Sequence, residues 1–258
     1  MSKSGKTFTL TFCDRAENHA GMQMIGDVAA TGFTYKDLKD ARENFINAGY
    51  RTKLIKLDKL LPADLNHKDD ASILIVRNGT DCILGNHDKD ELFAEQEALD
   101  HDKKAFMYGR VVNKHARHNL CFSDNAQEPD YANGKGRVIA FDDVPLTKYL
   151  RDNFTKYIPC KCDNLQAEGN YYYDVKKCGI GYHGDSERMI VIGVRLGASL
   201  PLCYQWHRNG VAVGENLKVT LRHGDIYMMS EKATGNDWKK KTIYTLRHAA
   251  GCSKYTDL

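Results

Sequence analysis

The feature that most constrains the fold of this chain is the dense succession of short apolar segments after residue 170. Each segment has the length and the β-branched and aromatic composition of a strand, and turn residues such as Asn209-Gly210 separate the segments. The predicted strands cover residues 188–196, 200–207, 216–222, 225–229 and 242–247. Strands that recur with so little chain between them are typical of a sandwich or a double-sheet jelly roll.

The first hundred residues have a different, mixed pattern. Strands are predicted over residues 6–12, 50–57 and 72–77, and helices over 37–48 and 88–104. Thr34 or Asp37 is a candidate cap for the first helix, and Gly49 ends it. Another amphipathic helix is predicted over 144–157. We therefore expect an α+β fold, with a mixed α/β N-terminal segment at 1–104 and a jelly-roll domain at 105–258.

The charge balance excludes a strongly basic nucleic-acid binder. The chain has 37 Lys and Arg against 34 Asp and Glu, a net charge of +3. A local basic groove remains compatible with this balance. No apolar run approaches the roughly 18 residues that cross a bilayer, and the first residues lack the apolar core of a signal peptide. The eight cysteines are scattered. These observations predict an intracellular protein, cytoplasmic or nuclear, with reduced thiols and no membrane partner.

The segment most suggestive of chemistry is His183-Gly184-Asp185. A His-x-Asp pair at the end of a strand presents an imidazole and a carboxylate to one point. With a second histidine from a distant segment, the pair forms the two-His-one-carboxylate triad of non-heme Fe(II) oxygenases. The loop from Cys13 to Gln23 is also dense in functional groups, and either a binding site or a hydrogen-bonded loop accounts for it.

Several segments accompany this pair in a fixed order. Asn170-Tyr171-Tyr172 lies thirteen residues upstream of His183, and the strand pattern I-V-I-G-V-R-L-G follows Asp185. Further on come Leu221 to Met229 (LRHGDIYMM) and Thr245 to Gly251 (TLRHAAG). This ordered set resembles the AlkB family of 2-oxoglutarate- and Fe(II)-dependent dioxygenases over residues 105–251. The resemblance implies a double-stranded β-helix, the jelly roll of that family.

The resemblance also implies roles for individual residues. His183 and Asp185 would bind Fe(II), while Asn170 and Tyr172 would contact 2-oxoglutarate. Arg247 would clamp the distal carboxylate of this cosubstrate, because a guanidinium suits bidentate contact, and the charge of Lys241 would assist it. On the substrate side, the family's substrate-facing loop corresponds here to a segment that contains Arg117 and Phe122, and Glu187 would lie near the substrate base.

The chain departs from the family at the third iron ligand. Relatives carry a histidine where residues 230–240 of this chain contain none. Three interpretations are open. Asp237 replaces the histidine, which is the assignment adopted for the metal site; His248 or His223 takes its place; or metal binding is lost. In a strand, His248 and Arg247 face opposite sides, so both cannot easily enter one pocket.

Two classes of function follow. The first is a dioxygenase that removes an alkyl group from a DNA or RNA base, for which basic residues interleaved with aromatics between Asn113 and Phe122 suit phosphate contact and base stacking. A variant of this class acts on a protein or a small molecule. The second is a catalytically silent relative with an incomplete triad, which only binds nucleic acid or protein.

Overall fold

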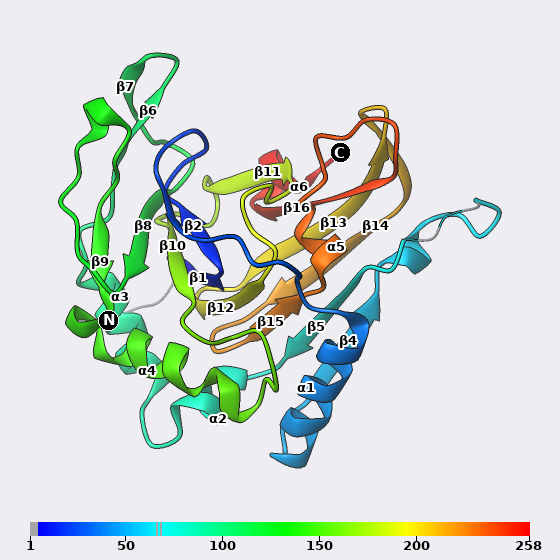
Figure 1. Cartoon of the computed structure of the whole chain (residues 1–258), viewed down its shortest axis with the longest axis horizontal. Coiled ribbons are helices and arrows are strands. Elements are labelled where there is room, and N and C mark those ends of the chain that lie inside the picture. The colour runs from blue at the N-terminus through cyan, green and yellow to red at the C-terminus, as the bar shows by residue number, and fades with distance from the viewer. Residues whose placement is uncertain (1–4, 66, 68) are drawn as a thin grey trace.

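The computed structural model describes residues 5–65, 67 and 69–258, and its largest element is an eight-stranded sheet (Figure 1). Its strands run antiparallel to their neighbours except for the last pair, which is parallel. In spatial order the sheet contains β4 (Thr52–Lys56), β5 (Ser72–Val76), β15 (Ile226–Met229), β12 (Val191–Gly197), β1 (Thr7–Cys13), β10 (Gln166–Tyr172), β8 (His118–Ser123) and β9 (Val138–Ala140).

A second, four-stranded antiparallel sheet packs against one face of the large sheet. Its spatial order is β11 (Gly179–His183), β16 (Thr245–Gly251), β13 (Leu200–Arg208) and β14 (Val211–Leu221). Buried side chains from both sheets meet between them, including Ile75 and Val191 from the large sheet and Trp206 and Leu246 from the small one. Two separate hairpins are β2 (Arg15–Glu17) with β3 (Met24–Gly26), and β6 (Lys104–Met107) with β7 (Arg110–Asn113).

Helices cover the opposite face of the large sheet (Figure 1). They are α1 (Tyr35–Asn47), α2 (Gly79–Leu84), α3 (Lys89–Glu97) and α4 (Pro145–Asn153). Short helices follow later as α5 (Glu231–Thr234) and α6 (Ser253–Thr256), and single 3₁₀ turns occur at Asp58–Leu60, Tyr131–Asn133, Phe141–Asp143 and Phe154–Lys156. The core on this side joins Phe45 of α1 and Leu150 of α4 to Phe12 and Val194 of the sheet.

The strands predicted after residue 188 are confirmed as β12 to β16, with shifted ends. The first predicted helix is confirmed as α1, and Thr34 caps it. The Thr34 hydroxyl accepts from the Asp37 amide at 3.2 Å, and the Asp37 carboxylate accepts from the Thr34 amide at 2.8 Å. The helix predicted over 88–104 is too long, because α3 ends at Glu97 and residues 104–107 form β6.

Strand β1 is an interior strand of the large sheet, and its two faces have different environments. It lies between β12 and β10, and all seven of its residues are buried. Phe8 and Leu10 pack in the core against the helices, whereas Thr9 and Thr11 line a cavity on the other side. The alternation along this strand therefore separates an apolar face from a hydroxyl face, both inside the protein.

The boundary expected at residue 104 does not divide the large sheet. Thr9 of β1 pairs with Arg195 of β12, and Ile75 of β5 pairs with Tyr227 of β15. Strands from before and after residue 104 thus hydrogen-bond to each other. The expected N-terminal segment and jelly-roll domain share one sheet, because the N-terminal strand supplies an interior position of it.

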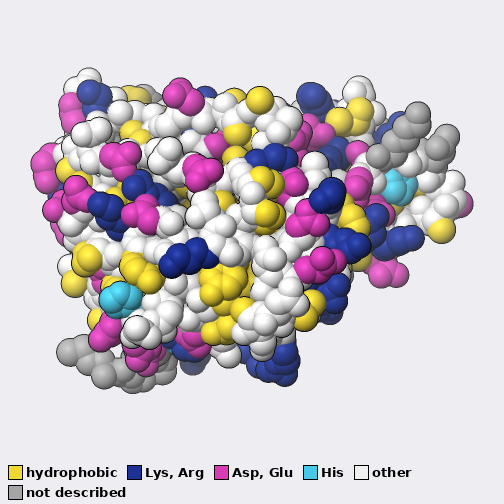
Figure 2. Space-filling model, turned by 60° about the horizontal axis from the view of Figure 1, so that its bottom comes forward, with side chains coloured by type: hydrophobic (Ala, Val, Ile, Leu, Met, Phe, Trp, Pro, Cys, Tyr) yellow, Lys and Arg dark blue, Asp and Glu magenta, His cyan; other side chains and the backbone are white. Residues whose placement is uncertain are grey.

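The surface shows no segregation of charge on the face toward the viewer in Figure 2, where basic and acidic side chains are interspersed with apolar ones. This mixture agrees with the small net charge of +3. Among the helices of the described residues, none combines the length and the apolar character needed to cross a membrane.

Candidate metal centre and the cavity around it

A cavity of about 550 Å³ lies between the two sheets. This volume falls within the ~300–1,000 Å³ typical of small-molecule sites. Strands β1, β10 and β12 of the large sheet form one wall, and β11 and β16 of the small sheet form the other. The lining also includes the N-terminal loop from Glu17 to Gly21 and the pair Trp238-Lys239.

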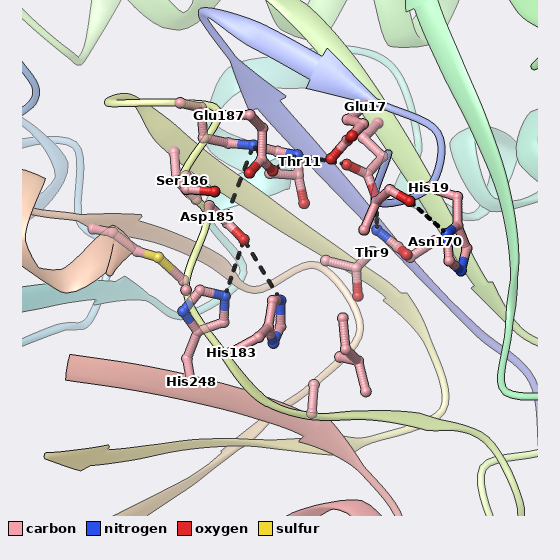
Figure 3. A pocket seen from close by; sticks show the side chains of 18 of the residues that line it. Thr9, Thr11, Glu17, His19, Asn170, His183, Asp185, Ser186, Glu187 and His248 are labelled. Atoms are coloured by element: carbon pink, nitrogen blue, oxygen red, sulfur yellow. Dashed lines mark hydrogen bonds and ion pairs between the residues drawn. The ribbon is translucent and has the colours of Figure 1, made fainter. Parts of the chain in front are cut away.

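Two histidines and one aspartate meet in the wall of this cavity (Figure 3). The Nε2 atoms of His183 and His248 lie 3.5 and 3.6 Å from Oδ1 of Asp185. One candidate ligand atom from each of the three residues lies within 4.8 Å of the others. Within the described residues, this is the group of three such side chains close enough to hold one metal ion.

The orientation of His183 is fixed by the backbone. Its Nδ1 lies 2.8 Å from the carbonyl oxygen of Gly181, and a carbonyl can only accept, so Nδ1 carries the proton. Nε2 is then the unprotonated nitrogen that faces Asp185, as a metal ligand requires. Burial and then the nearby His248 lower the pKa of His183 to about 3, which keeps its imidazole neutral.

The middle residue of the motif must be small. A Cβ atom at Gly184 would lie 2.1 Å from the carbonyl oxygen of Gly235 and 2.7 Å from Cβ of Trp238. The amide of Asp185 donates to the carbonyl of Thr234 at 2.9 Å, so the segment after β15 packs directly on the motif. Glycine allows this approach and thereby positions Asp185.

A buried arginine supports the aspartate. Arg188 donates to Glu168 at 2.7 Å and to Glu187 at 2.6 Å, and its Nε lies 3.9 Å from Oδ2 of Asp185. Burial opposes ionisation of Asp185, but Arg188 and His248 outweigh it and hold the pKa of this carboxyl well below its usual range. Asp185 is therefore ionised at neutral pH, which is the form that can bind a cation.

The structure corrects the third member of the predicted metal site. His248, and not Asp237, lies beside Asp185. The carboxylate of Asp237 instead accepts from Lys232 at 2.7 Å, and Lys232 also pairs with Asp69 at 2.9 Å. The ammonium group of Lys232 holds Asp237 in this separate cluster, so the triad is complete without it.

The predicted carboxylate clamp lies elsewhere as well. Arg247 and Lys241 are both absent from the cavity lining. Arg247 alternates with His248 along β16, and its guanidinium lies 5.3 Å from the ring centre of Trp238. Lys241 is exposed. Because successive side chains of a strand face opposite sides, the entry of His248 into the cavity excludes Arg247 from it.

Other predicted residues are divided between the cavity and the core. Asn170, Tyr172, Glu187 and Arg117 line the cavity, and Arg117 donates to Oδ1 of Asn170 at 2.6 Å. Phe122 does not line it, which corrects its predicted contact with substrate. Its ring is fully buried in the core on the helix side of the sheet, where it packs near the ring of Phe141.

The N-terminal loop proves to be both a hydrogen-bonded loop and part of the cavity. Asp14 accepts from the amides of Ala29 and Ile190 at 2.7 and 3.0 Å. Glu17 and His19 line the cavity opposite the group of His183, Asp185 and His248 (Figure 3). Burial, followed by neighbouring carboxylates, raises the pKa of Glu17 to about 7. The density of functional groups after β1 was the sequence signal for this wall.

Several cavity residues had no functional signal in the sequence, and two of them are arginines. Arg195 lies in β12, and Arg188 lies in the segment just before this strand. Both line a cavity only because the small sheet lies opposite them. His248 was one of the candidates for the third ligand, but the spacing of the family predicts that ligand within residues 230–240.

The sequence of the chain is similar to that of a viral protein. No family model matches the sequence. The chain is 48% identical over 256 residues to the uncharacterized protein R156 of Acanthamoeba polyphaga mimivirus, and the alignment covers 99% of each protein. Identity at this level over essentially the full length of both proteins establishes common descent. The chain therefore belongs to the same family as mimivirus protein R156.

Proposed function

We propose that this protein is an AlkB-like dioxygenase that uses Fe(II), O₂ and 2-oxoglutarate to hydroxylate an N-alkyl group on a nucleic-acid base. The observation that carries the proposal is the group of His183, Asp185 and His248 in the cavity wall. Two imidazoles and one carboxylate are the donor set of the facial triad in non-heme Fe(II) oxygenases, which leaves coordination positions for other ligands. The neutral imidazole of His183 and the ionised Asp185 suit that role.

The path of the chain between the sheets supports a jelly roll of the double-stranded β-helix type. Strand β10 belongs to the large sheet, β11 to the small, β12 to the large, β13 and β14 to the small, β15 to the large and β16 to the small. This repeated crossing between two facing sheets is how a jelly roll is built. Strand β1 completes the set from the other end of the chain.

The cavity suits a small anionic cosubstrate. Asn170 and Tyr172 line it, and Arg117, Arg195 and Lys239 contribute positive charge to the lining. Fe(II) and 2-oxoglutarate bound there would supply the O₂-dependent hydroxylation that removes an N-alkyl group.

Carboxyl groups on the remaining wall suit the polar edge of a base. Glu17 has a pKa near 7, so it is present both as an acceptor and as a protonated donor at neutral pH. Glu187 also lines the cavity, with one oxygen accepting from Arg188. Together these groups can bind the exocyclic amine of a base next to the metal-binding group.

A basic segment adjoins the cavity and supports a nucleic-acid substrate. Residues 103–123 contain five Lys and Arg and no Asp or Glu. They form the β6–β7 hairpin and β8, and Arg117 within them reaches the cavity lining. Tyr108 at the hairpin tip is 90% exposed. Cations next to an exposed aromatic ring suit the phosphates and bases of a single strand.

The test is anaerobic titration with Fe(II) or Mn(II), with and without 2-oxoglutarate, followed by calorimetry. We expect the wild type to bind metal, more tightly with 2-oxoglutarate, and His248→Ala to lose this binding. Asp237→Ala is the matched control and should keep it, because Asp237 pairs with Lys232. The loaded wild type is then incubated with alkylated oligonucleotides, and loss of the alkyl group is followed by mass spectrometry.

Two outcomes would contradict the proposal. If the wild type binds no metal but binds oligonucleotide, the protein is the catalytically silent binder. If metal and 2-oxoglutarate bind but no oligonucleotide is modified while a peptide or small molecule is, the oxygenase acts on another class of substrate.

A further inference from the structure

Arg195 is a buried arginine whose guanidinium forms no hydrogen bond or ion pair with a side chain among residues 5–65, 67 and 69–258. It is 1% exposed and lines the cavity, and its Nε and Nη1 atoms make no hydrogen bond. A guanidinium stays charged at any physiological pH. A buried charge without a counter-charge is costly, so this side chain calls for an anion that enters the cavity from outside.

We propose that Arg195 anchors a carboxylate of the cavity's ligand, namely the distal carboxylate of a short dicarboxylate such as 2-oxoglutarate. The identity of this ligand rests on the proposed function, whereas the requirement for an anion does not. Arg195 thereby takes the role that the sequence pattern gave to Arg247.

The backbone of β12 aims this side chain. Along a strand alternate residues share a face, so Val191, Gly193 and Arg195 face the small sheet while Ile192 lies in the core under the helices. A Cβ atom at Gly193 would lie 1.9 Å from the ring of Tyr227. Glycine at that position lets the ring of Tyr227 lie across the strand, and Tyr227 lines the same cavity as Arg195.

The neighbours of Arg195 leave room for an acceptor and add a donor. Thr9 of β1 is its cross-strand partner, and the Thr9 hydroxyl is buried without a hydrogen bond. The ring centre of Tyr172 lies 5.9 Å from the guanidinium carbon. The guanidinium N–H groups of Arg195 and the Thr9 hydroxyl together are a suitable donor set for a carboxylate.

Asp225 is the acidic residue that affects Arg195 electrostatically, but its carboxylate forms hydrogen bonds with other residues. The negative charge of Asp225 favours the charged form of Arg195. The two carboxylate oxygens of Asp225, however, already accept hydrogen bonds from the guanidinium of Arg77, from the amide of Arg222 at 2.8 Å and from the amide of Asn78 at 3.2 Å. Asp225 therefore holds the turn before β15 in place, and the charge of Arg195 remains available to a ligand.

The other buried arginine of the cavity shows the contrast. Arg188 donates to Glu168 and to Glu187, so its charge is balanced inside the protein. Arg195 lines the same cavity but forms no ion pair with a carboxylate in the described part of the chain. The chain thus places one balanced and one unbalanced arginine around the metal-binding group, and only the second is free to bind an external anion.

The experiment uses the full chain after treatment with a chelator, so that binding does not depend on metal. 2-Oxoglutarate and succinate are titrated by calorimetry into the wild type, Arg195→Met, Arg195→Lys and Arg247→Met. We expect Arg195→Met to bind at least about tenfold more weakly, as loss of charge-assisted hydrogen bonds implies. Arg195→Lys should lie in between, since an ammonium lacks the fork. Arg247→Met should bind like the wild type.

A second measurement guards against misfolding. Without ligand, Arg195→Met should unfold at the wild-type temperature or above it, because it removes an unbalanced buried charge, and it should keep the Mn(II) affinity of the wild type. Wild-type affinity for both dicarboxylates in folded Arg195→Met would overturn the inference, as would a loss of equal size in Arg247→Met. Dicarboxylate binding that depends on Arg195 in a protein that binds no metal would support the inference and refute the oxygenase.

Discussion

His183 and His248 are cross-strand partners in the small sheet, and the centres of their imidazole rings lie 4.4 Å apart. Four strands separate them along the chain. The register between β11 and β16 is irregular just before His183, and this irregularity brings both rings to the same side. A local bulge in one strand pair thus completes a group that the sequence leaves one residue short.

The glycine inside the His-x-Asp motif should be intolerant of any side chain. Gly184→Ala places a methyl group 2.1 Å from a backbone oxygen that cannot move freely. We expect the free energy of unfolding to fall by about 1–3 kcal/mol and Mn(II) affinity to fall as well. Gly181→Ala is the matched control in β11, three residues before Gly184, because nothing lies within 4 Å of its new Cβ. Equal behaviour of the two variants in urea unfolding and metal titration would argue against this packing.

Arg188 should be the most important cation for stability around the cavity. Arg188→Met leaves the buried Glu168 and the partly buried Glu187 without their cation, and breaking a buried pair costs about 3–5 kcal/mol. Lys36→Met is the control, because its ion pair with Asp40 is exposed to solvent and should change the stability little. The measurement is urea unfolding at neutral pH. A similar small effect in both variants would show that the buried network is not required.

Stability should depend on the titration of His101. Burial lowers the pKa of this imidazole to about 4, and its ring packs against Phe8 and Tyr171. Between pH 6.5 and 4 the unfolded chain binds a proton there that the folded protein does not, so the free energy of unfolding falls as the pH falls through this window. The shift corresponds to up to about 3 kcal/mol.

The comparison with His101→Phe isolates this effect, since all other groups titrate in both proteins. We expect the difference in unfolding free energy between wild type and variant to be constant above pH 7. It should move in favour of the variant as the pH is lowered from 6.5 to 4, and then level off. A difference independent of pH, measured by urea unfolding at intervals across this range, would refute the assignment.

The β6–β7 hairpin should contribute to binding of single-stranded nucleic acid. Lys104 and Arg110 are exposed and form no ion pair in the described part of the chain. Lys104→Glu with Arg110→Glu should weaken oligonucleotide binding by about tenfold and reduce its salt dependence, because each phosphate contact contributes about 0.7 to the logarithmic slope. Fluorescence anisotropy at several salt concentrations measures both quantities.

The control makes the same change in net charge on a different surface of the protein. Lys36→Glu with Lys39→Glu alters α1 instead, on the helix layer that covers the far face of the large sheet. Binding weakened equally by both double variants would show a nonspecific effect of net charge and no role for the hairpin.

Much of the local structure could be predicted from the sequence. Alternation and turn residues identified the strands β12 to β16, and Thr34 was one of the two candidate caps for α1. His183 and Asp185 were identified because one strand end presents both residues, and a spacing of two positions is enough to show it. These features depend on neighbours in sequence, which a pattern records.

The remainder was decided by contacts between distant segments. The alternation along β16 shows that either Arg247 or His248 enters the cavity, but only pairing with β11 determines which one does. The pattern around Arg195 identifies a strand without saying which face meets another sheet, and β1 gives no sign that it belongs between β10 and β12. Sheet pairing joins residues far apart in the chain, so only the tertiary structure brings His248 next to Asp185 and places Arg195 in the wall of the cavity.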